Sequence, residues 1–168
     1  IVDIETTGSF AKGHGITEIA IAIFDGTEMV NWYETLVNPG MEIPAFITAL
    51  TNITNEMVAD APTFEEVAEK VYELLEPCVF VAHNVNFDYS FVNKQLQAAG
   101  YDWNAKKLCT VRLSRKIFPN FKSYKLSFLC TELNVEQNIK HRAGADTLDG
   151  GAGSIDYVRY LRSDSGVD

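Results

Sequence analysis

Within the first forty residues, three runs show the pattern of apolar and polar positions that is typical of β-strands. Residues 1–4 are mostly apolar, residues 16–24 (ITEIAIAIF) are rich in β-branched side chains, and residues 29–37 continue the pattern. Asp25-Gly26, between the last two runs, is typical of a hairpin turn. The pattern therefore predicts an antiparallel meander of about three strands at the start of the chain.

Helical periodicity begins in the middle of the chain, at a capping box. Thr63 stands three residues before Glu66, and apolar side chains then recur over residues 67–75 at the spacing of one helix face. Pro77 follows, and proline commonly ends a helix. These signals predict a helix that begins after Thr63 and stops before Pro77.

The second half of the chain predicts a buried strand followed by helices. Residues 78–82 (CVFVA) form a short continuous apolar run, which is typical of such a strand. Further helices are expected from Asn84 or Asn86 to Ala99, over 110–118, over 126–133 and after about Arg142. This order predicts an α/β fold, with a mixed central sheet that contains an antiparallel meander and is flanked by helices.

Composition favours one globular domain over residues 1–168, with an atypical tail after about residue 147. The 168 residues are 46% hydrophobic, enough for one core, and no apolar run reaches the roughly 18 residues that span a membrane. The odd number and wide spacing of three cysteines favour a reduced, cytoplasmic setting: Cys78, Cys109 and Cys130. The start at Ile1, inside a strand, indicates a processed chain or a piece of a longer one.

Candidate chemistry begins in the first strand, at two acids. Asp3 and Glu5 are two residues apart, so both side chains leave the same face of the strand. Neighbouring carboxylates repel, and both stay ionised only if positive charge lies between them. A divalent cation is the simplest source of that charge, and the alternative is an ordinary solvent-facing edge strand.

Two more acids stand where helices are expected to begin. Asp88 falls in the first turn of the helix after the buried strand, where the helix dipole favours an ionised carboxylate. Asp146 follows His141 by five residues, a spacing that can bring an imidazole beside a metal-bound carboxylate. Taken alone, Asp88 is explained equally well by stabilisation of the helix dipole. Taken alone, the pair of His141 and Asp146 is better explained by a surface histidine and a helix-capping acid.

Taken together in order and spacing, these segments match three known motifs. Residues 3–8 (DIETTG), residues 83–88 (HNVNFD) and the pair His141 and Asp146 resemble the three exonuclease motifs of the DEDDh family. The chain is similar to this family from residue 1 to about 146, including the proofreading type exemplified by the epsilon subunit of bacterial DNA polymerase III. The resemblance implies an RNase H-like fold and hydrolysis from a 3′ end that releases nucleoside monophosphates.

The resemblance also implies a role for each site residue. Four carboxylates would hold two Mg²⁺ or Mn²⁺ ions: Asp3, Glu5, Asp88 and Asp146. His141 would be the general base, since a neutral imidazole can take a proton from water near pH 7. Oxygen-rich sites suit these two metals, and a pair of ions can clamp the attacking and leaving oxygens. Substrate contacts would come from Thr6, Thr7, Leu50, His83 and Phe87.

The chain departs from the family pattern at two places. Thr51 and Asn52 replace the usual His and Gly after Leu50, at the expected wedge against the terminal base. Three glycines follow Asp146 within residues 150–153, where the family has an alanine-rich helix. Each glycine costs about 1 kcal/mol relative to alanine inside a helix, so the last helix is expected to start late or fray.

The net charge of −9 at first argues against a nucleic-acid partner. Its distribution changes that picture, because residues 103–131 contain no acid and have a charge of +7, while the rest of the chain has −16. The bases of this window are Lys106, Lys107, Arg112, Arg115, Lys116, Lys122 and Lys125. The window predicts one basic side that could guide a strand, with Phe121 and Tyr124 available for stacking on bases. A solvated helix face is the alternative.

The sequence therefore predicts a metal-dependent 3′–5′ exonuclease that acts on DNA with a free 3′ end, preferentially single-stranded. A polymerase or a fused nuclease domain is the expected partner. Two alternatives stay open: an exoribonuclease of the same family, because sugar choice depends on contacts to the 2′-hydroxyl, and a non-hydrolysing nucleic-acid-binding or polymerase-docking module.

Overall fold

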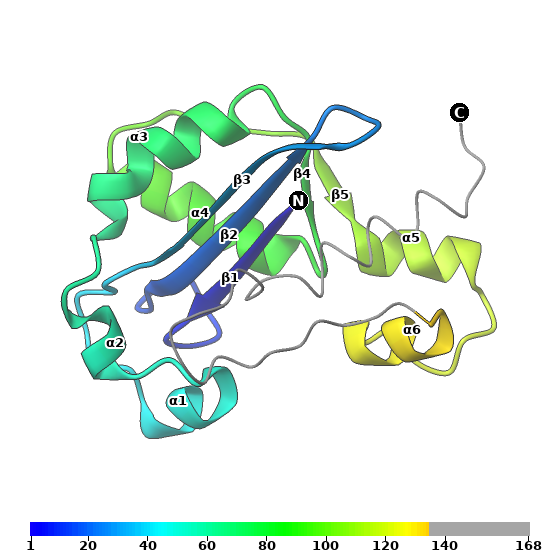
Figure 1. Ribbon diagram of the computed structural model, residues 1–168, viewed down its shortest axis with the longest axis horizontal. Helices are drawn as coiled ribbons and strands as arrows, with labels where there is room; N and C mark the ends of the chain where they lie inside the picture. Colours follow the sequence, from blue (N-terminus) through cyan, green and yellow to red (C-terminus); the bar gives the residue numbers. More distant parts are fainter. Residues whose placement is uncertain (135–168) are drawn as a thin grey trace.

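The computed structural model describes residues 1–134 (Figure 1). His141, Asp146 and the helix expected after Arg142 lie outside the described residues. The elements follow one another as β1 (Val2–Thr6), β2 (Ile16–Phe24), β3 (Met29–Leu36), α1 (Ala45–Thr51), α2 (Asn55–Ala59), α3 (Phe64–Leu75), β4 (Phe80–Ala82), α4 (Asn86–Ala98), β5 (Lys107–Cys109), α5 (Thr110–Ile117) and α6 (Leu126–Glu132).

β1, β2 and β3 form the predicted antiparallel meander, in the order β1-β2-β3. The turn between β2 and β3 is held by Asp25, whose Oδ1 accepts hydrogen bonds from the backbone N–H groups of Thr27 at 2.7 Å and Glu28 at 3.0 Å. Gly26 has φ 106°, a conformation that costs other residues free energy. Asp25 and Gly26 therefore stabilise the turn in two ways: the Asp25 side chain accepts backbone hydrogen bonds, and Gly26 adopts the positive φ that the turn requires.

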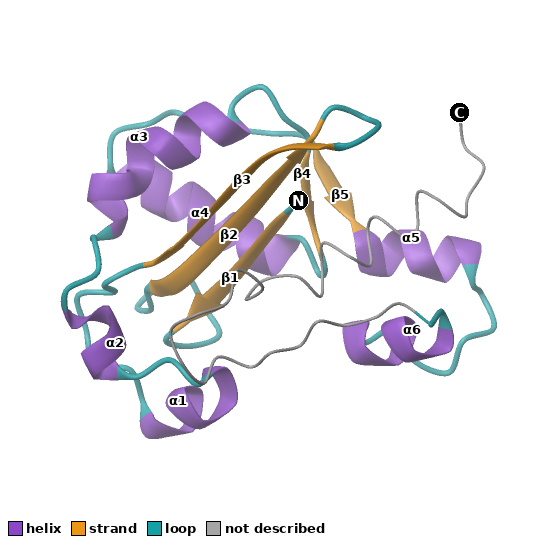
Figure 2. Ribbon diagram, viewed as in Figure 1, coloured by secondary structure: helices purple, strands orange, loops and turns teal. Residues whose placement is uncertain are grey.

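A second, parallel pair of strands lies beside the meander. β4 pairs with β5, with Phe80 opposite Lys107 and Ala82 opposite Cys109. β4 lies next to β1, while α3 and α4 lie against one face of the meander (Figure 2). The main core lies between these layers and includes Val2, Ile4, Ile19, Ile21, Val71, Phe80, Phe91 and Leu96. This is the mixed α/β arrangement that the sequence predicts.

The two middle helices begin differently from each other. At α3 the predicted capping box is present: Thr63 N donates to the Glu66 carboxylate at 2.7 Å, and Glu66 N donates to the Thr63 hydroxyl at 3.4 Å. At α4 the predicted asparagine cap is wrong, because the N-cap residue is Val85 and its side chain makes no capping bond. Asn84 instead adopts φ 68° and accepts a hydrogen bond from Phe87 N at 2.9 Å, so it forms the tight turn that leads into the helix.

Three short elements were not predicted. α1 and α2 are seven and five residues long, too short to show a clear helical period. They are held by a small apolar cluster of Ile43, Ile47, Ile53 and Val58. β5 has only three residues, and it forms by pairing with β4. No helix among residues 1–134 is long and apolar enough to cross a membrane.

Candidate active site

The first strand positions Asp3 and Glu5 on one face of the meander. Val2 and Ile4 alternate with them and are 1% and 6% exposed, so the opposite face of β1 is buried against the core. Directly paired residues of antiparallel strands share a face. Asp3 is paired with Ala20, and Glu5 is paired with the buried Glu18 of β2. The face that displays Asp3 and Glu5 therefore also carries Glu18.

Asp88 lies in the first turn of α4 and is 4% exposed. Burial and, after it, the nearby negative charges of Asp3 and Glu5 together raise the pKa of its carboxyl from 3.8 to about 8. Hydrogen bonds from the backbone of Asp88 itself and of Ile4, the residue between the two strand acids, act in the opposite direction. The structure thus brings the predicted Asp88 up to β1, within electrostatic reach of both predicted strand acids.

The two threonines after Glu5 use their hydroxyl groups inside the protein. Thr6 donates from Oγ1 to the carbonyl oxygen of Gly8 at 2.8 Å. Thr7 Oγ1 accepts from Gly15 N at 3.1 Å and lies 3.3 Å from the sulfur of Met41. Both side chains are buried. They fix the turn that leaves β1, and their contact with a terminal sugar stays a prediction.

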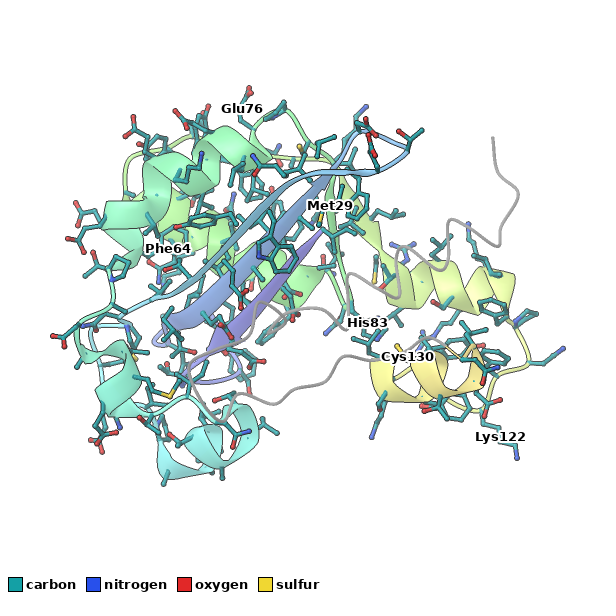
Figure 3. The ribbon with its side chains drawn as sticks, in the orientation of Figure 1. Met29, Phe64, Glu76, His83, Lys122 and Cys130 are labelled. Atoms are coloured by element: carbon teal, nitrogen blue, oxygen red, sulfur yellow. The ribbon has the colours of Figure 1, made fainter. Side chains whose placement is uncertain are left out.

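His83 connects the end of β4 to the α5–α6 region, as Figure 3 shows. Its Nε2 lies 3.0 Å from the carbonyl oxygen of Tyr124, which can only accept, so this nitrogen carries the proton. Its Nδ1 lies 2.9 Å from Thr110 Oγ1 and accepts from that hydroxyl. Burial lowers the pKa of the ring, which agrees with a neutral imidazole. His83 therefore holds structural elements together at the edge of the site, and its contact with substrate stays a prediction.

Two apolar candidates lie in different environments. Leu50, near the end of α1, is 72% exposed and is available to contact a ligand. Phe87 is half-buried, and its ring centroid lies 5.1 Å from that of Phe91. One turn before Leu50 on the same helix, Phe46 is 70% exposed. Sequence reasoning missed Phe46, although its i, i+4 spacing to Leu50 was a signal that could have found it.

Asp3, Glu5 and Asp88 are the described candidates for metal ligands. Among residues 1–134, the His, Cys, Asp and Glu side chains form no group of three that could hold a metal ion by themselves. The donor chemistry nevertheless fits Mg²⁺ or Mn²⁺, because Asp3, Glu5 and Asp88 offer only carboxylate oxygens. The mutual repulsion that raises the pKa of Asp88 would be relieved by a cation. His141 and Asp146, the other two predicted residues, lie outside the described residues.

Comparison with known proteins places this chain among the exonucleases. The sequence profile described as "Exonuclease" matches residues 1–149. The chain therefore belongs to the exonuclease family, as its three motifs predict, and the RNase H-like fold is confirmed with it.

Individual relatives agree with this assignment. The chain is 40% identical over 164 residues to a protein of Bacillus subtilis (strain 168) named 3′-5′ exonuclease DinG, a match that covers 96% of this chain and 18% of that protein. It thus spans less than a fifth of that relative's length. The structure is similar to that of Exonuclease X in complex with 5′ overhanging duplex DNA, with a TM-score of 0.72 and 25% identity over 99% of this chain and 92% of the other. It also shares its fold with exonuclease I, with a TM-score of 0.75 and 13% identity over 96% and 40% of the two chains.

Proposed function

We propose that this chain is a nuclease domain that removes nucleoside monophosphates from the 3′ end of DNA by metal-dependent hydrolysis. The observation that carries the proposal is the meeting of Asp88 with Asp3 and Glu5, where burial and like charge raise the pKa of Asp88 to about 8. Such a costly arrangement of acids is typical of functional sites. Membership of the exonuclease family supports the reaction, and the DNA named in the Exonuclease X complex supports the substrate.

The proposed roles of the acids follow from their chemistry. Asp3, Glu5, Asp88 and Asp146 would hold two Mg²⁺ or Mn²⁺ ions. When bound, such ions stabilise the charge that develops on the attacking and leaving oxygens of a phosphodiester. His141 would accept the proton of the attacking water, a task that suits an imidazole near neutral pH. Near pH 7 Asp88 would be mainly protonated without a cation, and a bound cation would favour its ionised form by compensating the charges of its neighbours.

The substrate contacts are proposed on exposure and position. Leu50 is exposed on α1 and would pack against the terminal base, while Phe87 would line the same pocket from the first turn of α4. Thr6 and Thr7 would lie near the terminal sugar through the turn that they fix. His83 would line the same pocket while its ring nitrogens stay bonded to Thr110 and Tyr124. A free 3′ end of a single strand is the substrate that we propose.

We also propose the wider setting that the sequence predicts. Residues 1–168 would form one domain, working with a polymerase or with other domains of a longer protein. The cysteines of the described residues are free, which is consistent with the proposed cytoplasmic location. None of these points affects the chemistry of the acidic site.

Nucleotide release tests the proposed function. Single strands of DNA and of RNA, each labelled on the 3′-terminal nucleotide, are incubated with Mn²⁺ and the wild-type protein. We expect labelled monophosphate from DNA, and a loss of at least about 100-fold in Asp3→Asn and Asp88→Asn, because each removes a charge that stabilises the transition state. Asp102→Asn, at an exposed position, is the matched control.

Three results would contradict the proposal. Release that survives in both acidic-site variants makes the site assignment wrong. Faster release from RNA than from DNA favours the exoribonuclease. Binding of the strand by the wild type without any release favours the docking module.

A further inference from the structure

Most of the basic window, from residue 110 onward, folds into one small unit, formed by α5, α6 and the loop between them, while Lys106 and Lys107 precede this unit. On α5, Arg112, Arg115 and Lys116 are exposed at i, i+3 and i+4, so they share one face of the helix. Thr110 and Ser114 are 1% and 0% exposed and turn the other face inward. The positive charges of α5 are therefore gathered on its outer side.

Aromatic packing gives the α5–α6 unit a core of its own. The rings of Phe118 and Phe121 stack with centroids 4.9 Å apart and an interplanar angle of 6°. Tyr124 donates from its hydroxyl to the Phe118 carbonyl oxygen at 2.7 Å, and the Arg115 guanidinium lies 5.4 Å from the centroid of the Tyr124 ring. Leu129 of α6 is fully buried among these side chains. The unit is thus a packed element that fixes the backbone positions from which its charged side chains project.

The parallel pairing of β4 and β5 sets this unit beside the acidic site. Ala82 at the end of β4 is paired with Cys109 at the end of β5. The chain that follows β4 leads to Asp88 in α4, and the chain that follows β5 enters α5 at once. Because the ends of parallel strands meet at one edge of a sheet, both helices start from the same edge. The two hydrogen bonds of His83 then fasten the start of α5 and the loop before α6 to that edge.

Charge complementarity indicates what this surface binds. Residues 110–132, which form this unit, contain five bases and one acid, a charge of +4, whereas the rest of the chain has −13. Lys122 and Lys125 of the loop are exposed like the α5 bases. Among the described residues, the acidic balance outside this unit disfavours the approach of a polyanion, so the unit offers a favourable approach to the acidic site.

We propose that the α5–α6 unit binds the backbone phosphates of the strand whose 3′ end enters the acidic site, at nucleotides upstream of the scissile bond. The direction of the strand rests on the proposed function, whereas the binding of phosphates by this surface does not. In this arrangement Arg112 and Lys116 contact phosphates from the outer face of α5. Arg115 contributes charge while it stays over Tyr124.

Strand binding without cleavage tests the proposal. The variant is Arg112→Gln/Lys116→Gln, which spares Arg115 and its ring contact. The matched control is Lys70→Gln/Lys94→Gln, which removes the same charge from exposed positions on α3 and α4. Fluorescence anisotropy with a 5′-labelled single strand of about 20 nucleotides, in the presence of a chelator, gives Kd over a range of salt concentrations.

We expect the variant to lose roughly 25-fold in affinity near 0.1 M salt. We also expect its slope of log K against log salt to be shallower by about 1.4, the effect of two phosphate contacts on a single strand. The control should lie close to the wild type in slope. Equal losses and equal slopes in the two variants would overturn the proposal and return these bases to the role of a solvated helix face or a site for an acidic protein.

A second arm separates this inference from the proposed function. The p-nitrophenyl ester of thymidine 5′-monophosphate, with Mn²⁺, is too short to reach α5. We expect both double variants to hydrolyse it at the wild-type rate, while hydrolysis of the long strand falls only in Arg112→Gln/Lys116→Gln. An equal loss on the short ester would overturn the inference, because the α5 bases would then act within the acidic site. If the wild type hydrolyses neither substrate, the proposed function fails, and the anisotropy result still decides whether α5 binds phosphates.

Discussion

Replacing Asp88 by asparagine should stabilise the metal-free protein while it destroys the activity. Asp88 is 4% exposed, and burial together with the charges of Asp3 and Glu5 raises the pKa of its carboxyl to about 8. Between pH 4 and pH 8 the folded protein therefore keeps a proton on Asp88 that the unfolded chain releases. Since the folded state binds more protons, stability is full below about pH 4 and falls as the pH rises towards 8.

The size of this effect follows from the shift in pKa. Above pH 3.8, the ordinary pKa of the carboxyl, ionisation lowers the free energy of the unfolded chain by about 1.4 kcal/mol for each pH unit up to pH 7. The folded protein does not gain this free energy, because its Asp88 stays protonated over that range. The folded state therefore loses about 4 kcal/mol relative to low pH. Asparagine has nearly the same shape and no acid to ionise, so Asp88→Asn recovers at most this amount at pH 7. The two proteins should be similar in stability near pH 4.

Urea unfolding of both proteins at pH 4, 5.5, 7 and 8, in a chelating buffer, measures this difference. Asp102→Asn, at an exposed position, is the control and should follow the wild type. Mn²⁺ should then stabilise the wild type increasingly as the pH rises, because the cation replaces the proton, and should stabilise Asp88→Asn far less. If Asp88→Asn is no more stable than the wild type at pH 8, or if its advantage is the same at pH 4, then the buried carboxyl of Asp88 does not destabilise the metal-free protein.

Three further outcomes follow from individual contacts. Thr63→Ala removes the capping box of α3 and should lower the free energy of unfolding, measured in urea, by about 1 kcal/mol. Thr27→Ala, in the exposed β2–β3 turn, should lower it by less, and equal losses would contradict the role of the cap. Because the pKa of His83 is lower in the folded protein than in the unfolded chain, the unfolded chain binds the proton at a higher pH, and stability should fall as the pH drops below about 6.5. A His83→Gln variant with the same pH dependence would show that another group is responsible. Leu50→Ala should leave the melting temperature unchanged, since the side chain is 72% exposed, but should slow release of the 3′-terminal nucleotide, and an unchanged rate would exclude the proposed wedge.

The parts of the fold that sequence predicted are those that local rules determine. β2 has the predicted bounds because its alternation and the Asp25-Gly26 turn are both local signals. α3 begins at its capping box for the same reason. β5 and α1 escaped prediction because pairing with β4 and a small apolar cluster, rather than their own periodicity, hold them in place.

The candidate site shows the same division. The order and spacing of the motifs were sufficient to select Asp3, Glu5 and Asp88, and the fold brings these three acids within electrostatic reach of one another. The position of Glu18 opposite Glu5 depends on strand register, which no single motif contains. The double engagement of His83 likewise depends on a carbonyl forty-one residues further along the chain. The sequence was sufficient to predict the chemical groups of the site. Which of these groups form hydrogen bonds or pairs with other residues of the protein depends on the tertiary structure.

Anomalous diffraction from a crystal soaked with Mn²⁺ and a nucleoside monophosphate shows directly whether the acidic site holds metal ions. We expect two manganese peaks beside the nucleotide phosphate, with Asp3 in contact with both and Asp88 in contact with one. Peaks that lie elsewhere, or a nucleotide bound with no metal near Asp3 and Asp88, would contradict the proposed metal site.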